Sequence, residues 1–148
     1  MKSKLGKLQA VAAGVLCLMA MQAQADVIKN AVRLGGFALF IGDSTVPLTT
    51  SGVTSVAFSG SGKFTIWYTA ECAASGYVDV DIVVDFEQLG PTGANDNDSF
   101  CDFNTRGATH TVTGRTASLT AGTHYVHIVA RKIDGVAYLS DSSLLIGK

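Results

Sequence analysis

The sequence predicts an all-β domain folded as an antiparallel two-sheet sandwich, Ig-like or jelly roll, with a closed barrel as the alternative. After residue 25 helical periodicity is hard to find, whereas apolar and polar residues alternate in one run after another. Turn residues separate these runs at short intervals, and the chain contains 16 glycines. About nine or ten short strands at such spacing are typical of a sandwich.

The expected strands follow one another from residue 27 onward. They cover residues 27–34, 37–41, 53–58, 63–72, 77–87, 109–113, 115–119, 123–132, 136–140 and 144–146. Ser59–Gly62 is expected to join the third and fourth strands as a hairpin. Asp134-Gly135 is expected to form a two-residue hairpin turn, because both of its positions need positive φ. Gly35-Gly36, Gly114 and Ala121-Gly122 are expected to separate neighbouring strands.

Two of the runs alternate sharply enough to assign their buried faces. In residues 63–72 the apolar face holds Phe64, Ile66, Tyr68, Ala70 and Cys72. In residues 77–87 it holds Val78, Val80, Ile82, Val84 and Phe86. The opposite face of the second run carries Asp79, Asp81 and Asp85, because successive side chains of a strand alternate between its faces. We expect this acidic stripe to be a solvent face whose charges oppose edge pairing.

The first 25 residues have the three parts of an export signal. Lys2, Lys4 and Lys7 give a positive start, residues 8–21 are apolar, and Ala23-Gln24-Ala25 is a small-x-small cleavage site. The apolar run is shorter than the roughly 20 residues of a membrane span. We therefore expect cleavage after Ala25, no transmembrane anchor after cleavage, and a secreted or periplasmic protein.

Residues 26–148 are expected to form a single domain, since about 123 residues is the usual size of one. Loss of the three leader lysines leaves 8 Lys and Arg against 12 Asp and Glu, so the net charge moves from −1 to −4. A mildly acidic chain without a basic cluster repels polyphosphate. Nucleic acid is therefore excluded as a partner.

Two cysteines, Cys72 and Cys101, remain after cleavage. An even count in an exported chain predicts that they form a disulfide. Closing a loop of about 30 residues should stabilise the fold by about 3–4 kcal/mol. A metal pair is the alternative, but no Cys or His lies at ligand spacing beside either residue. The polar segment 90–99 runs directly into Phe100 and Cys101, so the disulfide is expected to hold it to the sheet.

The main candidate for metal binding is a polar segment before Cys101. Asn95-Asp96-Asn97-Asp98 clusters oxygen donors, and Asp96 and Asp98 would be the Ca2+ ligands. The segment lacks the glycine and the distal glutamate of an EF-hand loop, so the alternative is a solvated turn. His124 and His127 are three residues apart, which points them to opposite faces of a strand. No other cofactor is expected.

Trp67 is the main candidate for ligand binding. It lies with Thr65 and Thr69 on the more polar face of its run. An exposed tryptophan on a sheet can stack on a sugar ring, with Tyr125 or Tyr138 as companions. The alternative is that a central strand is partly buried on both faces and that Trp67 belongs to the core.

An esterase-like motif is the main candidate for catalysis. Residues 40–44, ending in Gly-Asp-Ser, and residues 93–96 resemble the first and third blocks of the SGNH (GDSL-type) esterases. This resemblance implies that Ser44 is a nucleophile and Asn95 an oxyanion donor. That family also has an Asp-x-x-His near its C-terminus and an α/β fold. No histidine here has an aspartate three residues before it, so we expect the chain not to be an enzyme.

From residue 70 on, the order of landmarks resembles a group of exported bacterial two-cysteine proteins with a β-sandwich-like pattern and no assigned function. The landmarks are residues 70–72, 80–85, 98–101, 119–124 and 140–144. The resemblance supports the disulfide and the single domain and implies no activity.

These observations together favour an exported, non-enzymatic binding or structural module. Its partner would be a glycan or another protein. A further reading is a subunit of a surface assembly, in which residues 31–34 and 37–41 complete a neighbour's sheet.

Overall fold

The computed structural model describes residues 26–39, 42–89, 100–101, 105–132 and 134–148. These parts form ten strands and no helix, and no described segment could cross a membrane as a helix. The strands are β1 (Val27–Arg33), β2 (Phe37–Leu39), β3 (Gly42–Thr45), β4 (Ser55–Gly62), β5 (Thr65–Ala74), β6 (Val78–Val84), β7 (Glu87–Leu89), β8 (Thr105–Arg115), β9 (Leu119–Lys132) and β10 (Ala137–Gly147). The predicted signal peptide and the segment 90–99 lie outside the described residues.

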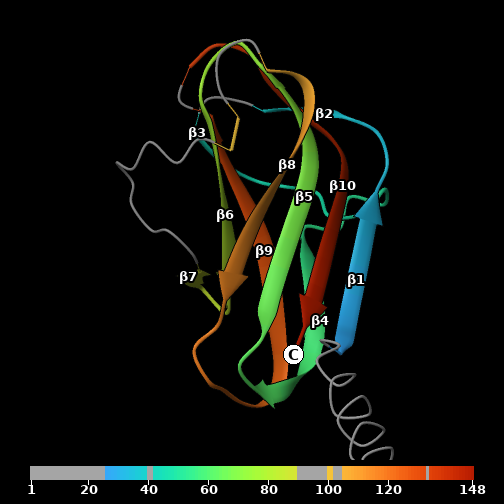
Figure 1. Ribbon diagram of the computed structural model, residues 1–148, viewed down its shortest axis with the longest axis vertical. Coiled ribbons are helices and arrows are strands. Elements are labelled where there is room, and N and C mark those ends of the chain that lie inside the picture. Colours follow the sequence, from blue (N-terminus) through green and yellow to red (C-terminus); the bar gives the residue numbers. More distant parts are fainter. Residues whose placement is uncertain (1–25, 40–41, 90–99, 102–104, 133) are drawn as a thin grey trace, which may run out of the picture.

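The strands form two antiparallel sheets that pack face to face, which confirms the predicted sandwich (Figure 1). Sheet A has the order β1-β10-β5-β8, and β2 also pairs with β10. Sheet B has the order β3-β9-β6-β7, and β4 also pairs with β9. The chain changes sheet at most connections, because β4, β6 and β9 belong to sheet B whereas β5, β8 and β10 belong to sheet A.

The core lies between the sheets and is built from the faces that the alternation predicts. The buried residues of β5 and β6 include Phe64 just before β5, Ile66, Tyr68, Ala70, Cys72, Val78, Val80, Ile82 and Val84. Val126, Ile128 and Ala130 of β9 are fully buried against them. Removing this apolar surface from water, at about 25 cal/mol per Å2, is the main force that holds the sheets together.

Two predicted hairpins are wrong. Ser59–Gly62 is the end of β4, which pairs with β9, and the chain then passes to β5 in the other sheet. Asp134-Gly135 likewise lies between β9 of sheet B and β10 of sheet A. A reversal of chain direction needs the same turn residues whether the next strand joins its own sheet or the facing one.

Three predicted breaks are absent. Gly114 lies inside β8 and Gly122 inside β9, and the last two predicted strands are one strand, β10, with a register shift between Ser140 and Ser143. Gly114 has a packing role, because a Cβ there would come within 2.8 Å of Leu89 Cβ. Gly114 therefore marks a close approach of neighbouring elements and not a turn, whereas a Cβ at Gly122 would meet nothing within 4 Å.

The disulfide between Cys72 and Cys101 is present and links the two sheets. Cys72 lies in β5 of sheet A. Cys101 forms an isolated bridge with Val78, the first residue of β6 in sheet B, through backbone hydrogen bonds in both directions. Both cysteines are buried. The bond is therefore a covalent cross-link through the core.

Candidate functional site

Trp67 is the third residue of β5 and lies on the outer face of sheet A, between β10 and β8. Its neighbours across the sheet are Leu145 of β10 and Thr113 of β8. The side chain is half-buried, and its ring rests on Gly147, since a Cβ built there would come within 3.0 Å of the indole. Trp67 is therefore outside the core, held on one side by the backbone of β10 and open to solvent on the other.

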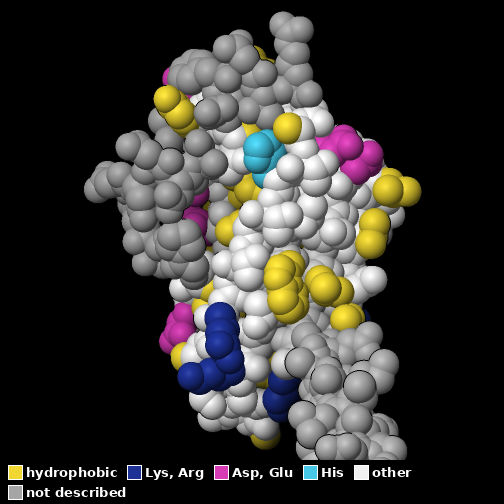
Figure 2. Space-filling model, in the orientation of Figure 1, with side chains coloured by type: hydrophobic (Ala, Val, Ile, Leu, Met, Phe, Trp, Pro, Cys, Tyr) yellow, Lys and Arg dark blue, Asp and Glu magenta, His cyan; other side chains and the backbone are white. Residues whose placement is uncertain are grey.

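The surroundings of Trp67 are mainly polar and uncharged, with Arg115 at their margin, opposite Thr65. We call the set Trp67, Leu145, Thr65, Thr69, Thr111 and Thr113 the Trp67 face. Its members occupy the outward positions of β5, β8 and β10. Thr69 Oγ1 and Thr111 Oγ1 lie 2.8 Å apart in a hydrogen bond. Figure 2 shows a group of hydrophobic side chains in the middle of this side of the molecule, with uncharged side chains above it and Lys or Arg side chains below and to its left.

The two tyrosines predicted as companions of Trp67 lie away from it. Tyr138 is on the same outer face, but its partner on β5 is Ala73, six positions from Trp67 and so about 20 Å along the strand. Tyr125 lies on β9, where it is exposed between the buried His124 and Val126. It therefore faces outward from sheet B, on the opposite side of the sandwich.

Ser44, the nucleophile that the esterase resemblance implies, has no histidine of β9 beside it. It lies in β3 opposite the buried Ala130, on the inner side of sheet B. His127 points to the outer side, and His124 lies six positions from Ala130, about 20 Å along β9. His110 belongs to β8 of the other sheet. The described geometry supplies no base for Ser44, and Asn95 lies outside the described residues.

Metal ligands in the described part of the chain do not gather into a site. No group of three or more His, Cys, Asp or Glu side chains that could hold an ion occurs there. Asp96 and Asp98, the predicted Ca2+ ligands, lie outside the described residues.

The acidic stripe of β6 is not a solvent face along its whole length. Asp81 is only 8% exposed, contrary to the prediction. Arg131, opposite Asp79 on β9, places Nη1 3.3 Å from Asp79 Oδ2 and Nη2 3.7 Å from Asp81 Oδ2. On the side away from β9, β6 pairs with β7 at Ile82–Val84 alone, and Val78 bridges Cys101. This pairing does not reach the middle of the stripe, so its role in opposing edge pairing stays a prediction.

Asp85, the third member of that stripe, has left the strand. β6 ends at Val84, and Asp85 and Phe86 form a two-residue turn after which Glu87 pairs back with Val84. Both turn residues have positive φ, 48° and 73°, as in a type I′ hairpin. Phe86 is 95% exposed, so its predicted place in the core is wrong.

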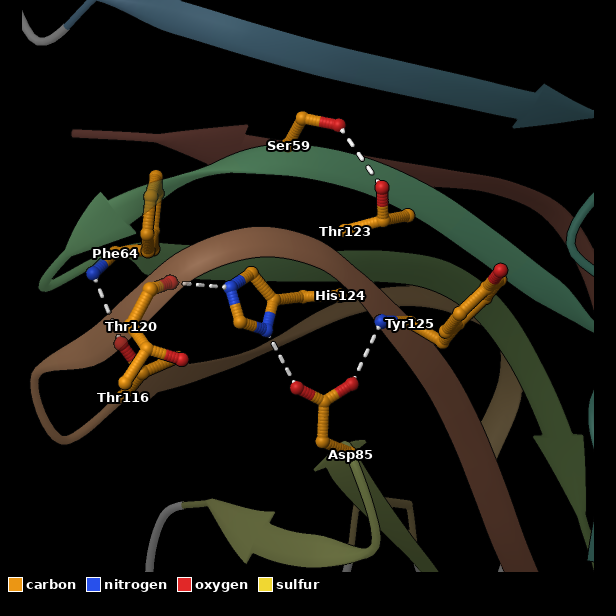
Figure 3. A network of polar contacts seen from close by, with 8 residues as sticks. All are labelled: Ser59, Phe64, Asp85, Thr116, Thr120, Thr123, His124 and Tyr125. Atoms are coloured by element: carbon orange, nitrogen blue, oxygen red, sulfur yellow. Dashed lines mark hydrogen bonds and ion pairs between the residues drawn. The ribbon is translucent and has the colours of Figure 1, made fainter.

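Asp85 and His124 form a polar contact at one end of the core that the sequence interpretation missed (Figure 3). Asp85 Oδ1 accepts a hydrogen bond of 2.9 Å from the Tyr125 amide, and Oδ2 lies 2.5 Å from His124 Nδ1. His124 Nε2 lies 3.0 Å from the Thr120 carbonyl oxygen. The imidazole is 6% exposed and packs against the ring of Phe58 at 5.4 Å.

This contact is an ion pair that holds the turn. Both ring nitrogens of His124 face acceptors, so both must donate, which requires the imidazolium form. The hydrogen bond to Asp85 raises the pKa of His124 against the opposing effect of burial. Burial acts to raise the pKa of Asp85, but the hydrogen bonds from His124 and the Tyr125 amide outweigh it and hold that pKa below its usual range. Neither nitrogen is free to accept a proton from a substrate, so the pair is structural.

Phe86→Gly is expected to raise the free energy of unfolding by about 1 kcal/mol, because a non-glycine residue in the left-handed region costs about 1–2 kcal/mol. Asp-Gly is also a preferred type I′ pair. Urea unfolding measures the change. Phe86→Ala is the control, since it removes the exposed ring but keeps the Cβ. A glycine variant less stable than the parent would contradict this account of the turn.

Comparison with known proteins gives matches to solved structures alone. No family model matches the chain, and no curated protein matches it. A structure of infectious bursal disease virus, Gx strain, is 12% identical with a TM-score of 0.46, covering 85% of this chain and 32% of the viral chain. This chain thus spans about a third of that protein. Eiger TNF from S. frugiperda is 12% identical with a TM-score of 0.47, and the match covers 84% of this chain and 93% of the Eiger chain. A carbohydrate-binding module of Cellvibrio mixtus lichenase 5A, in complex with cellotriose, is 14% identical with a TM-score of 0.39. The match covers 83% of this chain and 98% of the module.

Proposed function

We propose that this chain is an exported, non-enzymatic binding module that takes a neutral glycan on the Trp67 face. One observation carries the proposal: an indole is held on the outer face of sheet A, between β10 and β8, among side chains that are mainly threonines. A sugar ring has an apolar CH face and a rim of hydroxyls. The indole would stack on the CH face, and the threonine hydroxyls, which both donate and accept, would bind the rim.

The support under Trp67 favours binding. Its strand β5 is paired on both sides, and Gly147 of β10 leaves room for the ring to lie against the backbone. A platform that is already in place loses little side-chain entropy when a ligand binds. Leu145 beside it widens the apolar surface. The strand arrangement therefore prepares this position for stacking.

The charge of the chain favours a neutral ligand over an anionic one. The Trp67 face itself contains no cationic side chain, Arg115 lies at its margin opposite Thr65, and the chain without its predicted leader has a net charge of −4. A single cation at the margin of an acidic chain gives an anionic polymer little electrostatic attraction. Neutral polysaccharides are thus the class that this surface fits.

The exported location is part of the proposal and draws on two features. One is the leader predicted for residues 1–25. The other is the Cys72–Cys101 disulfide, since such bonds persist in oxidising compartments. Extracellular and periplasmic spaces also contain the polysaccharides that this surface would meet.

Trp67→Ala is expected to weaken glycan binding at least tenfold, because the stacked ring supplies both area and an aromatic contact, and tenfold is about 1.4 kcal/mol. The affinity is first compared by native electrophoresis of residues 26–148 in gels that contain soluble cellulose derivatives, xylan, mannan or glucan. Calorimetry with the polysaccharide that retards the protein then measures the affinity of each variant. Trp67→Phe should keep part of the affinity.

The matched control is Tyr125→Ala, which removes an exposed aromatic ring from the opposite sheet and should leave binding unchanged. Urea unfolding of each variant shows whether the fold is intact. Retardation by none of the polysaccharides, or equal retardation of the parent and Trp67→Ala, would overturn the proposed function.

A further inference from the structure

We infer that β8 is a self-pairing edge, through which two copies of this chain join sheet A into one continuous antiparallel sheet. The inference comes from the edges of the sandwich and does not depend on what the Trp67 face binds.

Among the described strands, β8 pairs with β5 on one side and with nothing on the other. Gly107, with φ 66°, is skipped in the pairing with β5, and from Ala108 to Arg115 the register is regular. The run from Gly107 to Gly114 contains no Asp, Glu, Lys, Arg or Pro. An edge strand of this length without a charge or a proline is open to pairing with another chain.

The other edges of the sandwich are charged or are shorter than this run. β1 places Lys29 and Arg33 at inward positions, opposite the buried Ile146 and Ser142, and inward charges are a recognised barrier to edge pairing. β3 and β7 are only four and three residues long. β4 pairs regularly with β9 over six residues, from Ser55 to Gly60, against the eight from Ala108 to Arg115 of β8. β8 is therefore the edge on which a second strand meets the fewest obstacles.

The inner side of β8 is also incompletely covered. Of its inward residues, Ala108 is exposed, and His110 and Val112 are half-buried. Their neighbours on β5, Tyr68 and Ala70, are fully buried. The core thus thins toward this edge. A second β8 would cover these side chains with their own counterparts, which adds apolar burial to the new backbone hydrogen bonds.

A second copy is the occupant that the charges favour. Pairing the stretch from Ala108 to Gly114 with itself over its full length puts Thr111 on a two-fold axis. Thr113 then lies opposite Thr109 of the second copy, and Val112 opposite its His110. No like charges face one another, and threonine pairs on one face of a sheet are favourable. A one-residue shift would set inner against outer positions, so the alternation excludes it.

This pairing would place both copies of the Trp67 face on one side of the joined sheet. Three strand spacings, about 14 Å, separate the two β5 strands across the sheet. A polymer that reached both tryptophans would bind more tightly than one that reached a single site.

The first test is the mass of residues 26–148 by size-exclusion chromatography with light scattering at rising concentration. The expected result is a dimer. Thr111→Lys and Thr111→Glu should each give monomers, because like charges then meet on the axis, and an equimolar mixture should restore a dimer of one copy each in native mass spectrometry. Thr69→Val is the matched control, since it removes the hydroxyl partner of Thr111 without touching the edge.

The second test fixes the register and does not depend on the charged variants folding. Thr111→Cys should form an intermolecular disulfide quickly under mild oxidation, because the two residues meet on the axis. Thr123→Cys, at an exposed position of β9, measures cross-linking by random collision. A monomeric parent at high concentration, dimers of both charged variants, or equal cross-linking at positions 111 and 123 would each overturn the inference.

Discussion

Replacing both Cys72 and Cys101 by alanine is expected to lower the free energy of unfolding by about 3–4 kcal/mol, the entropy of closing a loop of about 30 residues. Typical domains have about 5–15 kcal/mol in total, so the change is a large share of the margin. The bond joins β5 of sheet A to the bridge partner of Val78 in sheet B. Without it, the two sheets are held together by packing. Alanine is chosen because serine would add hydroxyls at buried positions.

Urea unfolding of residues 26–148 measures this loss. The parent protein with its disulfide reduced should show the same loss, because it lacks the same bond. The alanine variant should not respond to a reductant, which separates loss of the bond from other effects of reduction. A loss below about 1 kcal/mol would show that the unfolded chain is already constrained in this region or that the fold does not rely on the cross-link.

The His124–Asp85 pair is expected to make stability depend on pH in two directions. The folded protein holds the His124 proton more tightly than the unfolded chain does, because the pKa of His124 is raised above 6.5. That contribution is complete below pH 6.5 and is lost as the pH rises through the folded pKa. The pKa of Asp85 is lowered from 3.8, so its contribution is complete above that pH and is lost as the pH falls through its folded value. The pair therefore stabilises most between about pH 4 and 6.5.

Asp85→Asn should destabilise the protein by about 1–3 kcal/mol near pH 6. This is less than for a fully buried pair, because the Asp85 side chain is 38% exposed and solvent screens part of the interaction. The fall in stability above pH 6.5 should also flatten, because His124 would lose its carboxylate. Urea unfolding from pH 4 to 9 measures both effects, and His127→Gln on the outer side of β9 controls for the loss of a histidine. An unchanged profile in Asp85→Asn would show that the pair does not titrate with folding.

The alternation of apolar and polar residues predicted most of the core correctly, but it failed where the chain reverses direction after β6. In β5 every second residue from Ile66 to Cys72 is buried as expected. In β6 the same rule holds to Val84 and then fails at Phe86, because Asp85 takes up a left-handed conformation and reverses the chain. Asp tolerates the left-handed conformation, and this was the single local sign of the turn. Phenylalanine rarely adopts that conformation, so the presence of Phe86 favoured a continued strand over a turn.

For the candidate sites, too, the sequence predicted the position of a residue within its strand but not its contacts with distant residues. The sequence placed Trp67 on the polar face of its strand, and the structure confirms that position. It could not show that Gly147, 80 positions along the chain, provides the surface on which the indole rests. Nor could it pair Asp85 with His124, which no motif or spacing connects. Such contacts depend on which strands become neighbours.

By itself the sequence determined most of the strands, most of their buried faces and the cysteine pair, because side-chain alternation and the count of cysteines are local or countable properties. Only the tertiary structure decided which sheet each strand joins, that Arg131 compensates Asp79 and Asp81, and that β8 has a neighbour on one side alone among the described strands. The physical reason is that a turn specifies a reversal of direction but not a partner. The partner is chosen by the burial of whole faces, which many residues far apart in the chain decide together.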